Sequence, residues 1–178
     1  MRFYSVTIER LNALEAALNN ETREREFYLK NAERTSNPLG KAMFKQIADE
    51  ELEHYERLKG LHERWAKAEK WPETLPLVVK ETVVKDVLMG TIKKVEQMPE
   101  KDEDDLKAIR VAIDFESKGV AYYERLRDEV EDPKEKAFFD LLSRIEREHY
   151  LSLKEAEEFL VDPESWYIRT EHHSLNGA

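Results

Sequence analysis

Two short stretches decide the fold: ELEHY, which begins at Glu51, and EREHY, which begins at Glu146. In each stretch a histidine follows the glutamate by three positions, His54 in the first and His149 in the second. This spacing places a carboxylate and an imidazole one turn apart on the same face of an α-helix. The repetition predicts two helices that each present a pair of potential metal ligands.

Each of these glutamates has a partner 30 positions upstream, Glu21 before Glu51 and Glu116 before Glu146. The two sets are offset by 95 positions, so the chain carries the whole arrangement twice. Within each set, the two glutamates lie at nearly equal distances from the turn between their helices. In antiparallel hairpins, equal distances from the turn mean equal heights, so the sequence predicts one layer of four glutamates and two histidines.

Prolines and apolar periodicity divide the chain into long amphipathic helices. Asn37-Pro38 and Asp132-Pro133 each supply an N-cap and a proline at the first helical position, which predicts two tight hairpins. The predicted class is an all-α four-helix bundle over 1–161, two antiparallel hairpins joined by a long crossover that contains a short helix over 82–97. The predicted segments are helices over about 5–35, 38–70, 104–131 and 133–161, a crossover over 71–103 and a C-terminal tail over 162–178.

Composition narrows the possible functions. The 29 basic and 39 acidic residues give a net charge of −10, which argues against nucleic acid or an anionic membrane surface as the main partner. Cysteine is absent, which excludes disulfides, thiol catalysis, zinc–thiolate sites and iron–sulfur centres. No apolar run reaches the roughly 20 residues of a membrane span, so we expect a cytoplasmic protein.

Four carboxylates buried at one level would be poorly solvated, at a cost of several kcal/mol each. Two divalent or trivalent cations would remove that cost. Two bridging glutamates, two terminal glutamates and two histidines match a carboxylate-rich di-iron site, with di-manganese as the main competitor. The alternative is that these residues are solvated helix faces, since acidic residues are common in this chain.

The pattern Glu-x6-Tyr followed by Glu-x-x-His, present twice, resembles the rubrerythrin branch of the ferritin-like superfamily over 5–161. The resemblance implies a ferritin-like fold with two irons, in which Glu51 and Glu146 bridge the irons while Glu21 and Glu116 are terminal. The iron ligands that it implies are Glu21, Glu51, His54, Glu116, Glu146 and His149.

Two departures from the family are visible. Rubrerythrins proper carry a rubredoxin-type iron centre held by four cysteines, so this chain needs an external electron donor such as a rubredoxin-like protein. The family also has an additional glutamate one turn after its third-helix ligand, where this chain has Gly119. That glycine either allows close packing against the neighbouring hairpin or leaves an open position beside Glu116. Glu24, the symmetry-related candidate for a seventh carboxylate, is expected at the surface.

Three functions remain open. The resemblance favours an oxidoreductase that reduces hydrogen peroxide or dioxygen. The alternatives are an iron-handling protein that oxidises Fe(II), and a metal-stabilised bundle for binding or assembly. A homodimer is expected, and helices could be exchanged between its chains.

Several other residues carry expectations of their own. Tyr28 and Tyr123 are candidate catalytic residues that could donate hydrogen bonds to carboxylates across the bundle. Arg25 could pair with a nearby acid, and Trp166 is expected to dock the tail. The histidines expected at the surface are His62, His172 and His173.

Overall fold

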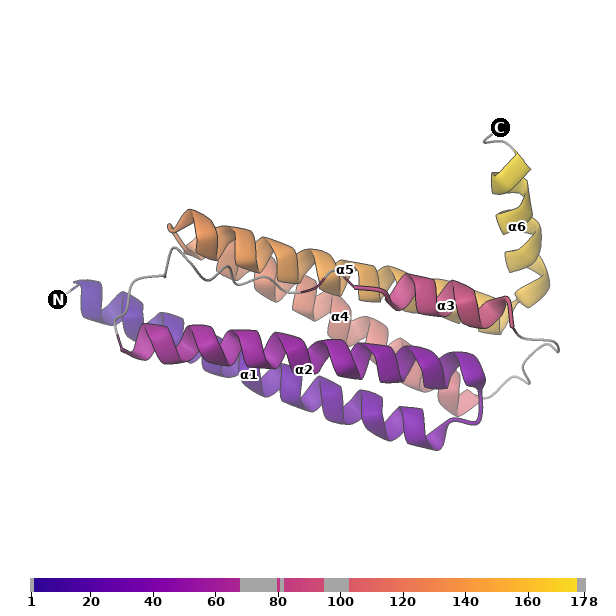
Figure 1. Cartoon of the computed structure of the whole chain (residues 1–178), viewed down its shortest axis with the longest axis horizontal. Coiled ribbons are helices and arrows are strands. Elements are labelled where there is room, and N and C mark those ends of the chain that lie inside the picture. The colour runs from indigo at the N-terminus through magenta and orange to yellow at the C-terminus, as the bar shows by residue number, and fades with distance from the viewer. Residues whose placement is uncertain (1, 68–79, 81, 95–102, 176–178) are drawn as a thin grey trace.

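The computed structural model describes residues 2–67, 80, 82–94 and 103–175, and every regular element among them is an α-helix. Four of the helices are long and two are short (Figure 1). The all-α class predicted from the sequence is confirmed. The long helices are α1 (Arg2–Arg34), α2 (Pro38–Ala66), α4 (Glu103–Glu129) and α5 (Pro133–Val161), and the short ones are α3 (Val84–Ile92) and α6 (Pro163–Leu175).

The predicted caps form the two hairpin turns. The side-chain oxygen of Asn37 accepts a hydrogen bond from the Leu39 N–H at 2.9 Å, at the start of α2. Asp132 accepts in the same way from the N–H of Lys134 at 2.8 Å, and Pro133 opens α5. An N-cap of this kind stabilises a helix by about 1 kcal/mol. The turns therefore fold α1 onto α2 and α4 onto α5, as two antiparallel hairpins (Figure 1).

The crossover helix α3 lies against both α2 and α5. It buries Val84, Leu88 and Ile92 on that side. It is shorter than the predicted 82–97, because Lys93 and Lys94 already form a turn, and 95–97 lie outside the described residues. Most of the remaining crossover, and the predicted end of the second helix at 68–70, also lie outside them.

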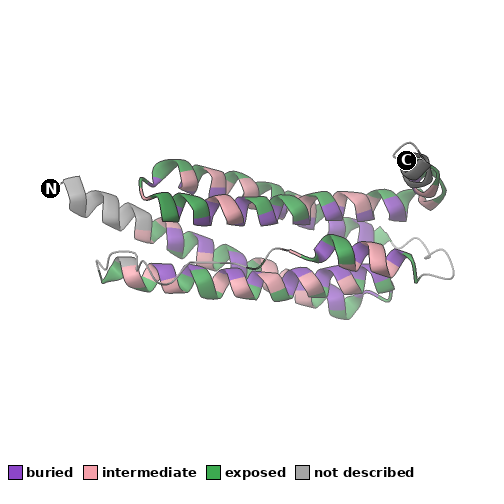
Figure 2. Cartoon of the chain, turned by 45° about the horizontal axis from the view of Figure 1, so that its top comes forward, coloured by how far each residue is buried: buried purple, intermediate pink, exposed green. Residues whose placement is uncertain are grey.

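The apolar core has two parts, and the polar layer lies between them along the bundle. One part lies toward the α1–α2 turn and includes Phe44, Ile47 and Leu153. The other lies toward the α4–α5 turn and includes Leu14, Leu58 and Phe139. Figure 2 shows buried residues along α2, α4 and α5 and along the part of α1 that follows residue 10. This arrangement encloses the polar layer between two dry regions.

The C-terminal tail forms a helix, α6, which the sequence analysis did not anticipate. Trp166 is 3% exposed and packs edge-on against Phe159 of α5, with ring centroids 5.3 Å apart. The tail therefore docks on its own bundle, while the rest of α6 projects away from it (Figure 1). None of the helices, as far as the structure describes them, is long and apolar enough to cross a membrane.

Candidate metal centre

The four long helices bring six acidic and imidazole side chains into one buried layer. All six are at most 2% exposed. They form two overlapping groups, and within each group one potential ligand atom per residue lies within 4.8 Å of the others. Both groups contain Glu51 and Glu146, which is the placement that bridging carboxylates require. Glu21 and His54 complete the first group, and Glu116 and His149 complete the second.

The two imidazole rings turn the same nitrogen toward the carboxylates. Nδ1 of His54 lies 3.1 Å from an oxygen of Glu51 and 3.3 Å from oxygens of Glu21 and Glu146. Nδ1 of His149 lies 3.5 Å from one oxygen each of Glu51, Glu116 and Glu146. The rings stack with their centroids 6.1 Å apart. Each imidazole is therefore oriented to bind a cation at the centre of its own group.

Unpaired atoms in the layer test whether it suits metal ions. Buried polar atoms normally have a hydrogen-bond partner. Here several carboxylate oxygens and one imidazole nitrogen are buried without one, and all of them face the two groups. Hard carboxylate oxygens with two imidazole nitrogens form a donor set suited to iron or manganese. The atoms are Oε2 of Glu21, Oε1 of Glu51, Oε2 of Glu116, both oxygens of Glu146 and Nδ1 of His149.

The electrostatics of the layer favour proton retention when no cation is present. Burial and neighbouring carboxylates raise the pKa of Glu21 and of Glu116 well above the usual value. Burial alone would lower the pKa of His54 and His149, but the surrounding carboxylates raise both. The same imidazoles lower the pKa of Glu51 against the effect of burial. Protons thus occupy positions that cations would take.

These shifts predict a pH dependence of metal binding. A raised pKa means that Glu21, Glu116 and both histidines hold their protons to a higher pH than usual, so protons compete with the metal. Affinity should therefore rise with pH, by up to about tenfold per pH unit for each proton displaced. Calorimetric titration with Mn(II) in buffers of different ionisation enthalpy measures that proton release. Binding that releases no protons between pH 6 and 8 would contradict the assignment of these ligands.

Glu21 and Glu116, the two expected terminal ligands, each accept a hydrogen bond from a tyrosine across the bundle, as predicted. The hydroxyl of Tyr28 on α1 donates to Glu116 on α4, and that of Tyr123 on α4 donates to Glu21 on α1. Both tyrosines are at most 3% exposed. Burial and the adjacent carboxylate raise the pKa of each phenol, so each remains a proton donor.

One residue of the site was missed in the sequence analysis. Glu50 lies 2.6 Å from Nε2 of His149, on the side of the ring opposite the carboxylate layer. Burial opposes its ionisation, but the hydrogen bond to His149 lowers the pKa of Glu50 to about 2. In the sequence, the feature that pointed to Glu50 was its position next to Glu51. The neighbouring residues gave no indication that its partner, His149, lies 99 positions away.

The expectation that Glu24 lies at the surface is wrong. Glu24 is half-buried, because it follows Glu21 by one turn on the inward side of α1. Burial, followed by the charges of Glu51 and Glu116, raises the pKa of Glu24 to about 11. It lines a pocket of about 190 Å³ between α1 and α4, together with Gly119.

Gly119 makes room for Glu146 of its own hairpin rather than for the neighbouring hairpin. A Cβ atom at this position would lie 3.3 Å from Cγ of Glu146. Such a contact is tight, so a side chain there would press on a carboxylate shared by both groups. The glycine therefore protects the shape of the layer.

The other candidates lie outside the layer. Arg25 forms no ion pair with any described acid, and its Nε atom is buried without a partner. His62, which was expected at the surface, is half-buried instead, and it belongs to neither group. The side chains of His172 and His173 are outside those described. The dimer stays a prediction, but one chain assembles the six-residue layer without exchanging helices.

The sequence matches the model of one known protein family. The family model described as Rubrerythrin matches residues 12–157, which include every residue of the layer. The chain belongs to the rubrerythrin family. No curated protein matches the chain significantly. No solved structure does so either.

Membership of the rubrerythrin family agrees with the ferritin-like bundle and implies a di-iron site. Among the described residues, the two overlapping groups are the place where such a site fits. The rubrerythrin family model ends at residue 157, before α6, so α6 lies beyond the matched region.

Proposed function

We propose that this chain is a di-iron oxidoreductase that reduces hydrogen peroxide to water, with dioxygen as a second possible oxidant. The observation that carries the proposal is the duplicated layer, with its unpaired buried oxygens and a tyrosine donor on each terminal glutamate. The balanced reaction takes two electrons and two protons per peroxide and yields two waters. Since the chain has no cysteine, an external carrier such as a rubredoxin-like protein supplies the electrons.

Two iron ions would be held by Glu51 and Glu146 as shared ligands, with Glu21 and His54 at one position and Glu116 and His149 at the other. Manganese is the competing metal. When bound, the iron pair supplies the two-electron redox chemistry. The protein supplies a fixed ligand geometry and, through the apolar regions on both sides, a site from which bulk water is largely excluded.

The protein also supplies proton donors close to the layer. Tyr28 and Tyr123 hold their phenolic protons against Glu116 and Glu21, and orient these carboxylates by the same hydrogen bonds. Glu24 lines the pocket between α1 and α4, one turn after Glu21, so its carboxyl group lies on a path for protons between solvent and the layer. We propose that peroxide approaches through this pocket, beside Gly119.

Steady-state peroxide consumption tests this function. Iron-loaded protein with a reduced rubredoxin-type donor, under anaerobic conditions, should consume peroxide over many turnovers and oxidise two donor equivalents per peroxide. A single oxidation of bound Fe(II) followed by no turnover would contradict peroxide reduction and favour the iron-handling alternative. Metal-free protein is the control for reaction between donor and peroxide alone.

The tyrosines give a second prediction. Replacing Tyr28 by Phe removes the hydrogen bond to Glu116 with little change in shape, so turnover should fall by about 10–100-fold, as for other residues that orient metal ligands. Tyr122→Phe is the matched control, because the Tyr122 hydroxyl donates to the carbonyl of Ala13, away from the layer, at 2.6 Å. Equal turnover in the Tyr28→Phe and Tyr122→Phe proteins would show that Tyr28 has no role in the reaction.

A further inference from the structure

The two halves of the duplicated site differ at one pair of positions that affects the histidines. The 95-residue offset pairs His54 with His149, and Glu50 with Ile145. Glu50 has a carboxylate oxygen 2.6 Å from Nε2 of His149, whereas Ile145 is an apolar core residue that is 1% exposed. The two halves of the layer therefore differ in what supports their imidazoles.

The support of His149 comes from the far side of its ring. Nδ1 faces the carboxylates, while Nε2 lies 2.6 Å from Oε2 of Glu50, so an Nε2–H proton would be donated to Glu50. This hydrogen bond fixes the ring orientation, with Nε2–H turned toward Glu50 and Nδ1 turned toward the cation position. By contrast, His54 contacts Glu21, Glu51 and Glu146 through Nδ1, and no acid among the described residues pairs with its Nε2.

Glu50 is itself held in place by the crossover. Its Oε1 atom accepts hydrogen bonds from the side-chain amide of Gln46 at 2.7 Å and from the Val83 N–H, just before α3, at 3.2 Å. The Glu50 carboxylate on α2 therefore connects the crossover to the His149 imidazole on α5. His149 is the more firmly oriented of the two potential imidazole ligands.

We propose that the two metal positions are inequivalent, and that the position formed by Glu116 and His149 fills first because Glu50 positions His149. The cation there displaces the Nδ1 proton of an imidazole whose orientation is already set. At the position formed by Glu21 and His54, the imidazole orientation becomes fixed only when the cation binds. Because the two positions exist only if the six residues bind metal, the inference rests on the metal site proposed above, but not on peroxide reduction.

The test uses Mn(II) at one equivalent per chain. Crystals of the full chain grown with this metal should show a stronger anomalous peak beside His149 than beside His54. Equal peaks, or a stronger peak beside His54, would overturn the proposal. No peak at either position would overturn the proposal and the metal site together.

The variant Glu50→Gln keeps the shape of the side chain and removes its charge. The affinity of the first Mn(II), measured by anaerobic calorimetry, should fall about 10–100-fold. The anomalous peaks should become equal or reverse. An unchanged affinity and an unchanged peak ratio would show that Glu50 does not position His149 for metal.

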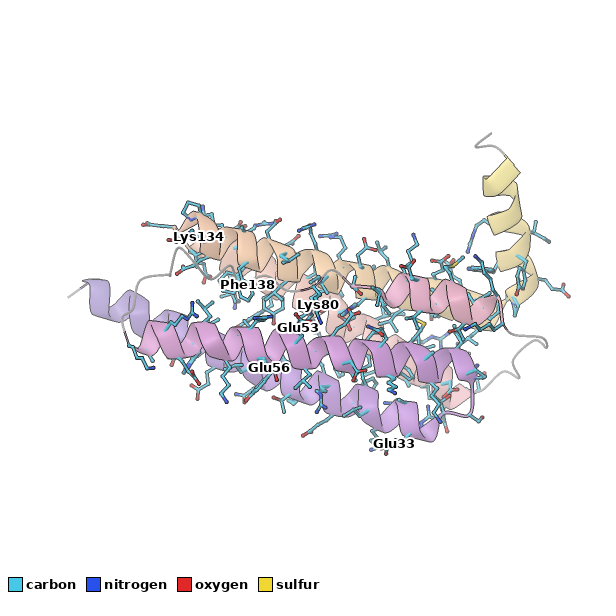
Figure 3. The ribbon with its side chains drawn as sticks, in the orientation of Figure 1. Glu33, Glu53, Glu56, Lys80, Lys134 and Phe138 are labelled. Atoms are coloured by element: carbon cyan, nitrogen blue, oxygen red, sulfur yellow. The ribbon has the colours of Figure 1, made fainter. Side chains whose placement is uncertain are left out.

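Glu53→Gln is the matched control for loss of charge and for contact with the crossover. Glu53 lies on the same helix and accepts a hydrogen bond from the Lys80 N–H at 3.4 Å, and Figure 3 shows the two residues side by side. It belongs to neither metal group. Its substitution should leave the first affinity and the peak ratio unchanged, and an effect equal to that of Glu50→Gln would overturn the specific role of Glu50.

Discussion

Replacing Glu51 by Ala should reduce the metal content of the purified protein from about two ions per chain to nearly none. Glu51 belongs to both metal groups, so each cation would lose an anionic ligand. The two cations would also repel each other more strongly, because the negative charge of Glu51 would no longer lie between them. Elemental analysis after anaerobic reconstitution with Fe(II) measures the content. Glu146→Ala should behave in the same way.

Two further variants sharpen this result. His54→Ala removes a ligand of one group alone, so it should mainly weaken one ion and leave about one per chain. Glu53→Ala removes a carboxylate from the same helix outside both groups and should keep about two. Full occupancy in the Glu51→Ala protein, with its fold intact by circular dichroism, would contradict the assignment of Glu51 as a bridge.

Metal binding should also raise the thermal stability strongly. A ligand that binds only the folded state at 1,000 times its dissociation constant stabilises that state by about 4 kcal/mol. For a domain of this size, this free energy corresponds to an increase in Tm of about 8–16 °C. Calorimetric melts with Mn(II), and with a chelator in its place, measure the difference.

The Glu51→Ala protein provides the control for this stabilisation. Because it should bind neither ion, its Tm should be the same with Mn(II) as with chelator. An equal increase in Tm in the wild-type and Glu51→Ala proteins would show that Mn(II) stabilises the protein at another place, and would contradict the account of the buried layer.

The polar layer was predictable because its signals are local and repeated. A spacing of three on a helix fixes the relative placement of Glu51 and His54 without knowledge of any other helix. The hairpin turns at Asn37 and Asp132 then fix the heights of the remaining members, since helix geometry is regular. Both caps form as predicted, and the six residues meet.

The parts that were missed depend on distances between helices. Glu50 looks like any acidic residue on a helix surface, and only the packing of α2 against α5 brings it to His149. Glu24 was placed at the surface, although it shares the inward side of α1 with Glu21. For Gly119 the sequence left two interpretations, packing against the neighbouring hairpin or an open position beside Glu116, and neither includes the side chain that a Cβ there would meet first, Glu146 of its own hairpin. Periodicity alone does not determine such contacts.

The central claim is that the four helices of one chain hold two metal ions between Glu51 and Glu146. Crystals of the Fe(II)-loaded protein, prepared anaerobically and measured at the iron absorption edge, test it most directly. We predict two anomalous peaks within the layer, one beside Glu21 and His54 and the other beside Glu116 and His149, with Glu51 and Glu146 touching both. A single peak, or iron bound outside the layer while the layer stays empty, would contradict this claim.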